Sequence, residues 1–114
     1  MVKIAYLLLC HKNADSVIAQ ARALTAAGDA VAIHFDKRGS NKEYTRIREV
    51  VDADPAITLA KRVACGWGEY SLVQATFNLI HAARDAFSDV THYLMISGDC
   101  YPTKTRAYIE QALA

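Results

Sequence analysis

The sequence predicts one α/β domain in which helices cover both faces of a mostly parallel sheet. Several short apolar stretches are continuous rather than alternating, as expected of strands buried on both faces. They alternate with segments whose apolar residues recur every three or four positions, the pattern of amphipathic helices. A chain of 114 residues, 53% hydrophobic and with two prolines, has room for one domain, residues 1–114, with one core.

Four segments are predicted strands because apolar and β-branched residues are bounded by turn residues. They are Ile4 to Leu9, Ala30 to Phe35, the weaker Ile57 to Leu59, and about six residues from His92. Right-handed crossovers between them give a three-layer arrangement in which the carboxyl ends of the strands share one edge.

Four helices are expected between and after these strands. Asn13 or Asp15 is a candidate cap for the first helix, which Gly28 ends in a left-handed turn. The second runs from Lys42 to about Val51, and the last covers residues 103–113. The third has the strongest periodicity, and its expected inner face consists of Leu72, Val73, Thr76, Leu79, Ile80, Ala83 and Phe87.

The charge balance excludes binding by bulk electrostatics. Thirteen basic and twelve acidic residues give a net charge of +1, too little to attract nucleic acid or an anionic membrane. No stretch approaches the roughly 20 apolar residues of a membrane span. Cys10, Cys65 and Cys100 form no paired zinc motif, and they favour a reduced, cytoplasmic setting.

Polar residues follow the strands at the shared edge, where ligands of open α/β sheets bind. After the fourth strand, Ser97, Gly98 and Asp99 offer a hydroxyl, a close backbone approach and a carboxylate. The alternative is a plain turn in which Asp99 caps the next helix. Asp36, at the end of the second strand with His34 on the same face, is suited to accept hydrogen bonds from ribose or a base; it is equally a surface partner of Lys37 or Arg38.

Other local motifs are weaker. There is no lysine-bearing P-loop or three-glycine dinucleotide turn. Trp67, between two glycines, is either an aromatic plug in a turn or a wall against a base or sugar. Asp52 and Asp54 have the Asp-x-Asp spacing of many metal-dependent glycosyltransferases, but they follow a charged helix and are interpreted as its stop. His11 is either a ligand contact or a turn residue.

Four stretches in register resemble the amino-terminal half of the core-2/I-branching enzymes, a group that includes β-1,6-N-acetylglucosaminyltransferases and peptide O-xylosyltransferases. They read IAYLLLCHK, AIHFDKRG, CGWGEYSLVQATFNLIHAA and HYLMISGDCYPTKT, and with the residues between them they span nearly the whole chain. The resemblance implies the Rossmann-like half of a GT-A fold, which binds the UDP of a UDP-sugar in an inverting transferase that has no Asp-x-Asp metal motif and no metal cofactor.

The resemblance also assigns residues. Asp36 matches a nucleoside-contacting position, and the segment from Arg62 to Trp67 lines the nucleotide. Cys100 stands where the family usually has its aspartate, one position after Asp99. Together with the strand-end residues, the predicted nucleotide site comprises His11, Asp36, Arg62, Trp67, Ser97, Gly98 and Asp99.

No catalytic or metal-binding residue is assigned in this chain. An inverting transferase needs a carboxylate base, and a metal-free one needs a cation at the departing diphosphate. By the resemblance both lie in the carboxy-terminal half, so we expect no transfer activity from these residues alone. Animal relatives carry a membrane anchor before the first strand; a chain beginning on that strand fits a bacterial, cytoplasmic enzyme.

The sequence therefore predicts the UDP-sugar-binding portion of an N-acetylglucosaminyl- or xylosyltransferase with a glycan or glycoprotein acceptor. One alternative is a non-catalytic module that binds a nucleotide or a partner. A phosphoacceptor receiver domain fits poorly, because Cys10 and His11 stand where its acidic cluster belongs. A third alternative is a structural role in which an exposed sheet edge drives dimerisation.

Overall fold

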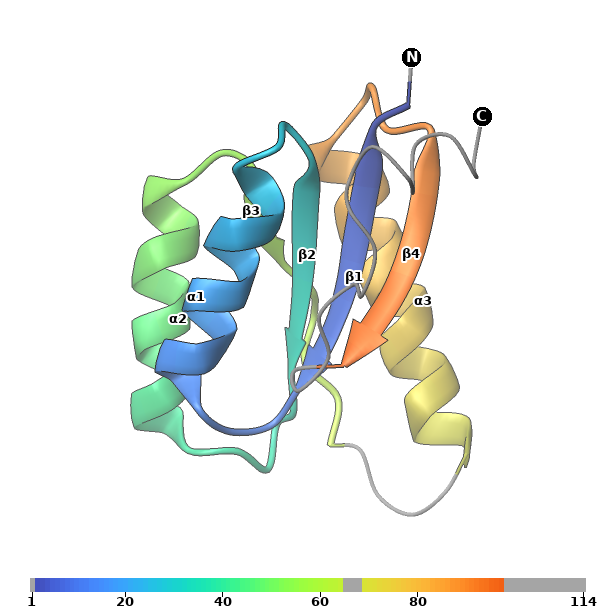
Figure 1. The fold of residues 1–114 in the computed structure, drawn as a ribbon. Helices are drawn as coiled ribbons and strands as arrows, with labels where there is room; N and C mark the ends of the chain where they lie inside the picture. The colour runs from blue at the N-terminus through green and yellow to red at the C-terminus, as the bar shows by residue number, and fades with distance from the viewer. Residues whose placement is uncertain (1, 65–68, 98–114) are drawn as a thin grey trace.

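The computed structural model describes residues 2–64 and 69–97, which form the predicted α/β arrangement (Figure 1). The strands are β1 (Ile4–Cys10), β2 (Ala30–Phe35), β3 (Ile57–Leu59) and β4 (His92–Ser97). The helices are α1 (Ala14–Thr25), α2 (Asn41–Ala53) and α3 (Glu69–Ala86). The expected last helix lies outside the described residues.

All strand pairs are parallel, and the strand order is β3-β2-β1-β4. The central strand β1 pairs with β2, where Leu9 lies opposite His34, and with β4, where Leu9 lies opposite Ser97. Every residue of β2 is buried, which explains its unbroken apolar sequence. The four strands thus end at the same edge, at the bottom of Figure 1.

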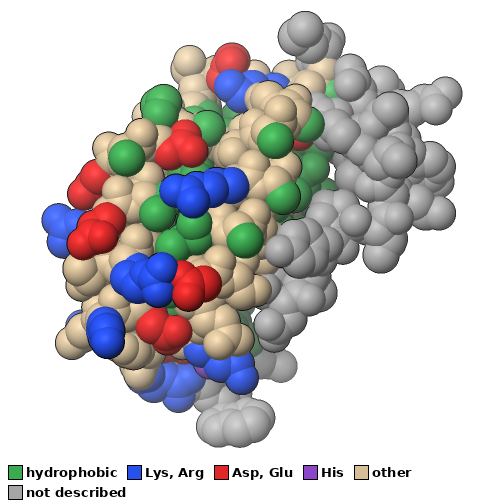
Figure 2. All heavy atoms as spheres, turned by 60° about the vertical axis from the view of Figure 1, so that its left-hand side comes forward, with side chains coloured by type: hydrophobic (Ala, Val, Ile, Leu, Met, Phe, Trp, Pro, Cys, Tyr) green, Lys and Arg blue, Asp and Glu red, His purple; other side chains and the backbone are tan. Residues whose placement is uncertain are grey.

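Two helices cover one face of the sheet and one covers the other, which gives three layers (Figure 1). Side chains of α1 and α2 pack with Val31, Ile33 and Phe35 of β2. Ala30 and Ala32 alternate with these residues along β2, so they point to the opposite face and pack with α3. Figure 2 shows charged side chains of both signs interspersed on the visible surface, with no large field of one sign.

The inner face of α3 differs from its predicted face. Ala75, Leu79 and Ala83 are fully buried, and Phe87, just after the helix, is 7% exposed. Leu72 and Val73 are instead 47% and 48% exposed, so assigning them to the core was wrong. Ala75, Leu79 and Ala83 are four residues apart and therefore lie on the same face of the helix, against the sheet. The small side chain of Ala75 lets the helix approach the sheet closely.

The first helix is capped from another helix. Asn13 holds the N-cap position with φ 60° and its side chain makes no cap hydrogen bond, so neither Asn13 nor Asp15 is the predicted side-chain cap. The Glu43 carboxylate of α2 accepts hydrogen bonds from the backbone N–H groups of Asn13 (3.0 Å) and Ala14 (3.3 Å). Gly28 adopts φ 92° after α1, as predicted.

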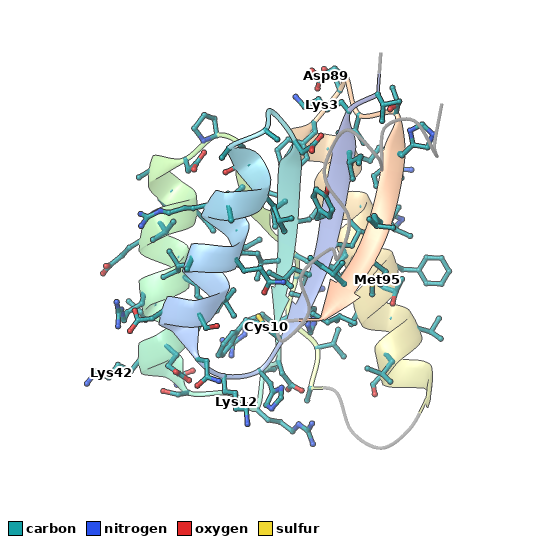
Figure 3. All side chains as sticks on the ribbon, viewed as in Figure 1. Lys3, Cys10, Lys12, Lys42, Asp89 and Met95 are labelled. Atoms are coloured by element: carbon teal, nitrogen blue, oxygen red, sulfur yellow. The ribbon has the colours of Figure 1, made fainter. Side chains whose placement is uncertain are left out.

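An ion pair and a hydrogen bond connect the residue before β1 with the loop before β4, at the amino-terminal end of the sheet. The Lys3 ammonium pairs with Asp89 at 2.9 Å, and the backbone N–H of Lys3 donates to Thr91 Oγ1 at 2.9 Å. Lys3 and Asp89 are labelled at the top of Figure 3. Within residues 2–64 and 69–97, no helix is long and apolar enough to cross a bilayer.

Candidate functional site

A pocket of about 270 Å³ opens at the carboxyl edge of β1 and β2, lined by His11, Asp36, Arg38 and Gly39. His11 directly follows β1 and Asp36 directly follows β2. The backbone N–H of Asp36 donates to the Cys10 carbonyl at 2.9 Å, which extends the β1–β2 pairing to the rim of the pocket. Cys10 and Lys12 are labelled at this end of the molecule in Figure 3.

Asp36 is the buried acid of the pocket. It is 6% exposed, and its Oδ1 accepts hydrogen bonds from the Arg38 backbone N–H (2.9 Å) and Nε (3.3 Å). Its Oδ2 accepts one from an Arg38 terminal nitrogen at 3.1 Å. The Arg38 side chain is 59% exposed. The surface pairing foreseen for Asp36 therefore exists, but its carboxylate is buried while its partner reaches into solvent.

Gly39 lets the turn close against β1. A Cβ added there would strike the Phe35 ring and lie 2.9 Å from the His11 carbonyl oxygen. Because only hydrogen fits, glycine at this position brings the Asp36–Gly39 turn onto the residue that follows β1. The glycine thus contributes to the shape of the pocket.

Arg62 supports the end of β2 rather than lining this pocket. Its Nε donates to the Phe35 carbonyl and a terminal nitrogen donates to the Asp36 carbonyl, both at 3.0 Å. Its guanidinium carbon lies 3.9 Å from the centre of the Tyr44 ring, a cation–π contact that further fixes the side chain. Arg62 therefore fixes the backbone of Phe35 and Asp36, from which the Asp36 carboxylate extends.

His34 is buried on the face of the sheet that α3 covers, with 0% exposure. Its Nε2 accepts a hydrogen bond from the Val63 backbone N–H at 2.9 Å. Burial lowers the pKa of His34 below its ordinary value, an effect that the Asp36 carboxylate opposes. The imidazole is therefore neutral over a wider pH range than an exposed histidine.

Cys10 is unsuited to nucleophilic chemistry. Burial, with a smaller contribution from Glu43, raises the pKa of its thiol to about 12. Its Sγ lies 3.6 Å from the His34 carbonyl, to which it donates weakly. Since the thiolate is the reactive form, this cysteine is a structural core residue.

A family model for the Core-2/I-Branching enzyme matches residues 4–114. The chain belongs to this family. Core-2/I-branching enzymes are glycosyltransferases, which move a sugar from a donor to a glycan acceptor, and the α/β fold with its parallel sheet agrees with that assignment. A search among curated proteins returned no match.

In this core-2/I-branching domain the predicted site residues divide into three groups. His11 and Asp36 line one pocket, and Arg62 supports it from behind. Ser97 is the last residue of β4, opposite Leu9 on the same sheet edge. The others lie outside the described residues: Trp67, Gly98 and Asp99.

Sequence reasoning did not assign two residues of the pocket to the site: Gly39, and Arg38, which it named only as a surface partner of Asp36. Both follow Asp36 in the stretch AIHFDKRG, where a glycine after a strand-end acid was the available signal. Within residues 2–64 and 69–97, no group of three His, Cys, Asp or Glu side chains is arranged to hold a metal ion. Asp54 at the end of α2 accepts a hydrogen bond from the Ala56 backbone N–H at 2.9 Å, as a helix-stop turn does.

Proposed function

We propose that this domain binds the UDP moiety of a UDP-sugar for an inverting, metal-independent glycosyltransferase, and that the transferred sugar is N-acetylglucosamine or xylose. The acceptor would be a glycan or glycoprotein. The observation that carries the proposal is the buried Asp36 carboxylate, held by the half-exposed Arg38 in a pocket at the carboxyl edge of the sheet. This is the edge at which open α/β sheets bind nucleotides.

The pocket suits one end of a nucleotide. Its volume of about 270 Å³ lies just below the usual range of small-molecule sites, so it matches a base or ribose rather than a whole nucleotide sugar. A buried carboxylate is a strong acceptor for a base N–H or a ribose hydroxyl. The planar guanidinium of Arg38 is able to stack on a base. We assign Asp36 to hydrogen bonding with the nucleoside and Arg38 to stacking.

The proposal gives no role to the Asp52-x-Asp54 pair. The backbone N–H of Val31, at the start of β2, donates to the Ala56 carbonyl, so the end of α2 lies at the amino-terminal edge of the sheet. Asn41, by contrast, begins α2 near the pocket residue Gly39. The thirteen residues of α2 correspond to about 20 Å of helix. That distance removes the pair from a nucleotide bound beside Asp36.

Calorimetric titration with UDP tests the proposal. The protein is titrated first in EDTA and then in manganese, with ADP as the control nucleotide. We expect selective UDP binding that manganese does not tighten appreciably. Equal binding of ADP would favour the non-catalytic nucleotide module, and a large manganese dependence would overturn metal independence. No UDP binding would refute the proposal for this domain.

Removing the Asp36 carboxylate gives a residue-specific test. Asp36→Ala is expected to weaken UDP binding by about 1–3 kcal/mol, because a buried charged acceptor is lost. Asp85→Ala is the matched control, since Asp85 is exposed on α3. Calorimetry of both variants at one pH makes the comparison. Unchanged UDP affinity in Asp36→Ala would exclude this residue from the site.

A further inference from the structure

Beyond β3, side chains replace part of the ladder of backbone hydrogen bonds along β2. The Ala60 N–H still donates to the Ile33 carbonyl at 2.8 Å. Further along, the carbonyls of Phe35 and Asp36 accept from the Arg62 side chain. The Val63 N–H, in turn, donates to the His34 imidazole. The segment 60–63 therefore follows the end of β2 although it has left the sheet.

The hydrogen bond from Val63 defines the tautomer of His34. Because Nε2 accepts the Val63 N–H, the single proton of the neutral ring resides on Nδ1. Nδ1 is buried and has no hydrogen-bond partner among the described residues. A leucine in place of His34 would remove the unsatisfied Nδ1–H group, but it would leave the Val63 N–H without its acceptor. The useful contact of this histidine is thus the one at Nε2.

Val63 connects the imidazole to the pocket. Its carbonyl accepts a hydrogen bond from the Lys37 backbone N–H at 3.2 Å. Lys37 stands between Asp36 and Arg38, the carboxylate and guanidinium that line the pocket. A chain of contacts therefore runs from the His34 ring through one peptide amide and carbonyl to the turn that carries both charged groups.

We propose that His34 is a positioning residue for this pocket: its neutral, Nδ1-protonated imidazole holds Val63, and Val63 fixes the turn on which Asp36 and Arg38 meet a nucleotide. The effect on binding rests on the proposed UDP function. His34 does not touch the ligand. Protonation of Nε2 would place a donor against the Val63 N–H, breaking the contact and loosening the turn.

Among the described residues, two charged groups act on the ring. Asp36, just after β2, favours its protonation, and Arg62, from the segment after β3, opposes it. On β1 the residue opposite His34 is Leu9. The side chains that α3 buries against the sheet are the apolar Ala75, Leu79 and Ala83. Burial is therefore the largest influence on the pKa of His34, and these two charges modify it in opposite directions.

Three proteins test the positioning role. His34→Gln keeps an acceptor amide oxygen near the position of Nε2, His34→Leu has none, and His81→Gln is the control at an exposed histidine of α3. The readouts are amide hydrogen exchange at Val63, the NMR signal of the Arg38 Nε–H, and UDP affinity. In His34→Leu we expect about tenfold faster exchange at Val63, a shifted Arg38 signal and roughly three- to tenfold weaker UDP binding.

His34→Gln is expected to restore all three readouts toward those of the wild type, and His81→Gln to leave them unchanged. Unaltered Val63 exchange in His34→Leu, or an unaltered Arg38 signal alongside faster exchange, would overturn the proposal. Nitrogen NMR of the wild-type ring adds a test that needs no variant: a proton on Nε2 at neutral pH would also overturn it. If the wild type fails to bind UDP, the proposed function fails, while exchange and the Arg38 signal still decide the role of His34.

Discussion

The Asp36 carboxylate illustrates how a single residue combines burial with accessibility. Its partner Arg38 is 59% exposed, so the guanidinium reaches solvent while the carboxylate with which it pairs is buried. Local sequence indicated the acid because it ends a strand, but it did not indicate how deeply the acid is buried. The close approach of Gly39 to the backbone of His11 in the same pocket was likewise not indicated by local sequence.

His34 gives the stability of the domain a predictable pH dependence. Its pKa is lowered in the folded state, chiefly by burial, so between the lowered value and the unfolded value of about 6.5 the unfolded chain binds more protons. The neutral imidazole therefore contributes its full stability above about pH 6.5, and the contribution is lost as the pH falls through the folded pKa.

Urea denaturation at several pH values between about 5 and about 7.5 measures this contribution. The free energy of unfolding of the wild type should fall more steeply with decreasing pH than that of His34→Gln, which has no titrating group at this position. Every other ionisable group is common to the two proteins, so the difference reports on His34. Parallel pH profiles would show that the residue titrates alike in the folded and unfolded chains.

At the scale of elements, the capping of α1 by Glu43 links two helices. Glu43→Ala removes the acceptor of the Asn13 and Ala14 N–H groups, so we expect the free energy of unfolding to fall by about 1 kcal/mol. Chemical denaturation measures the change. Glu49→Ala, at an exposed position of the same helix, is the control for loss of a glutamate from α2. Equal effects of the two substitutions would refute the capping role.

The elements themselves were largely predictable, and their finer contacts were not. Continuous apolar runs identified β1 and β2 because both faces of these strands are buried, and β2 has the predicted bounds. The cap of α1 escaped prediction because its acceptor comes from a helix about thirty residues later. The inner face of α3 was misassigned because hydrophobicity favoured Leu72 and Val73, whereas close packing against the sheet favours Ala75.

For the whole molecule, β4 is one of the two edge strands of the described sheet, and β3 is the other. β4 is last in the order β3-β2-β1-β4, so its outer backbone edge has no neighbouring strand in the described sheet. Tyr93 and Met95 lie on the face of β4 that α3 covers and are 43% and 41% exposed beside that edge. No charged residue lies between Tyr93 and Ser97 to discourage edge pairing. On this basis we expect the edge to pair with a second copy of the chain.

Sedimentation velocity over a range of concentrations tests this self-association. Met95→Lys should shift the protein toward the monomer, because a lysine at a strand edge opposes pairing. Ala23→Lys, at an exposed position of α1, introduces the same charge away from the edge and should leave the association unchanged. A wild type that stays monomeric at every concentration would contradict the expectation.

The central place of β1 has a consequence for the order of folding. Its paired residues in β2 are 25 positions away in sequence, as in Ala5 and Ala30, whereas the bond between Lys3 and Thr91 joins residues 88 positions apart. Long loops close late because their entropy cost precedes any gain from contacts. During synthesis, one edge of β1 therefore lacks its partner strand β4 until nearly all the described residues have left the ribosome. A nascent chain stalled before β4 exposes that edge, and we expect it to depend on chaperones more than the finished domain does.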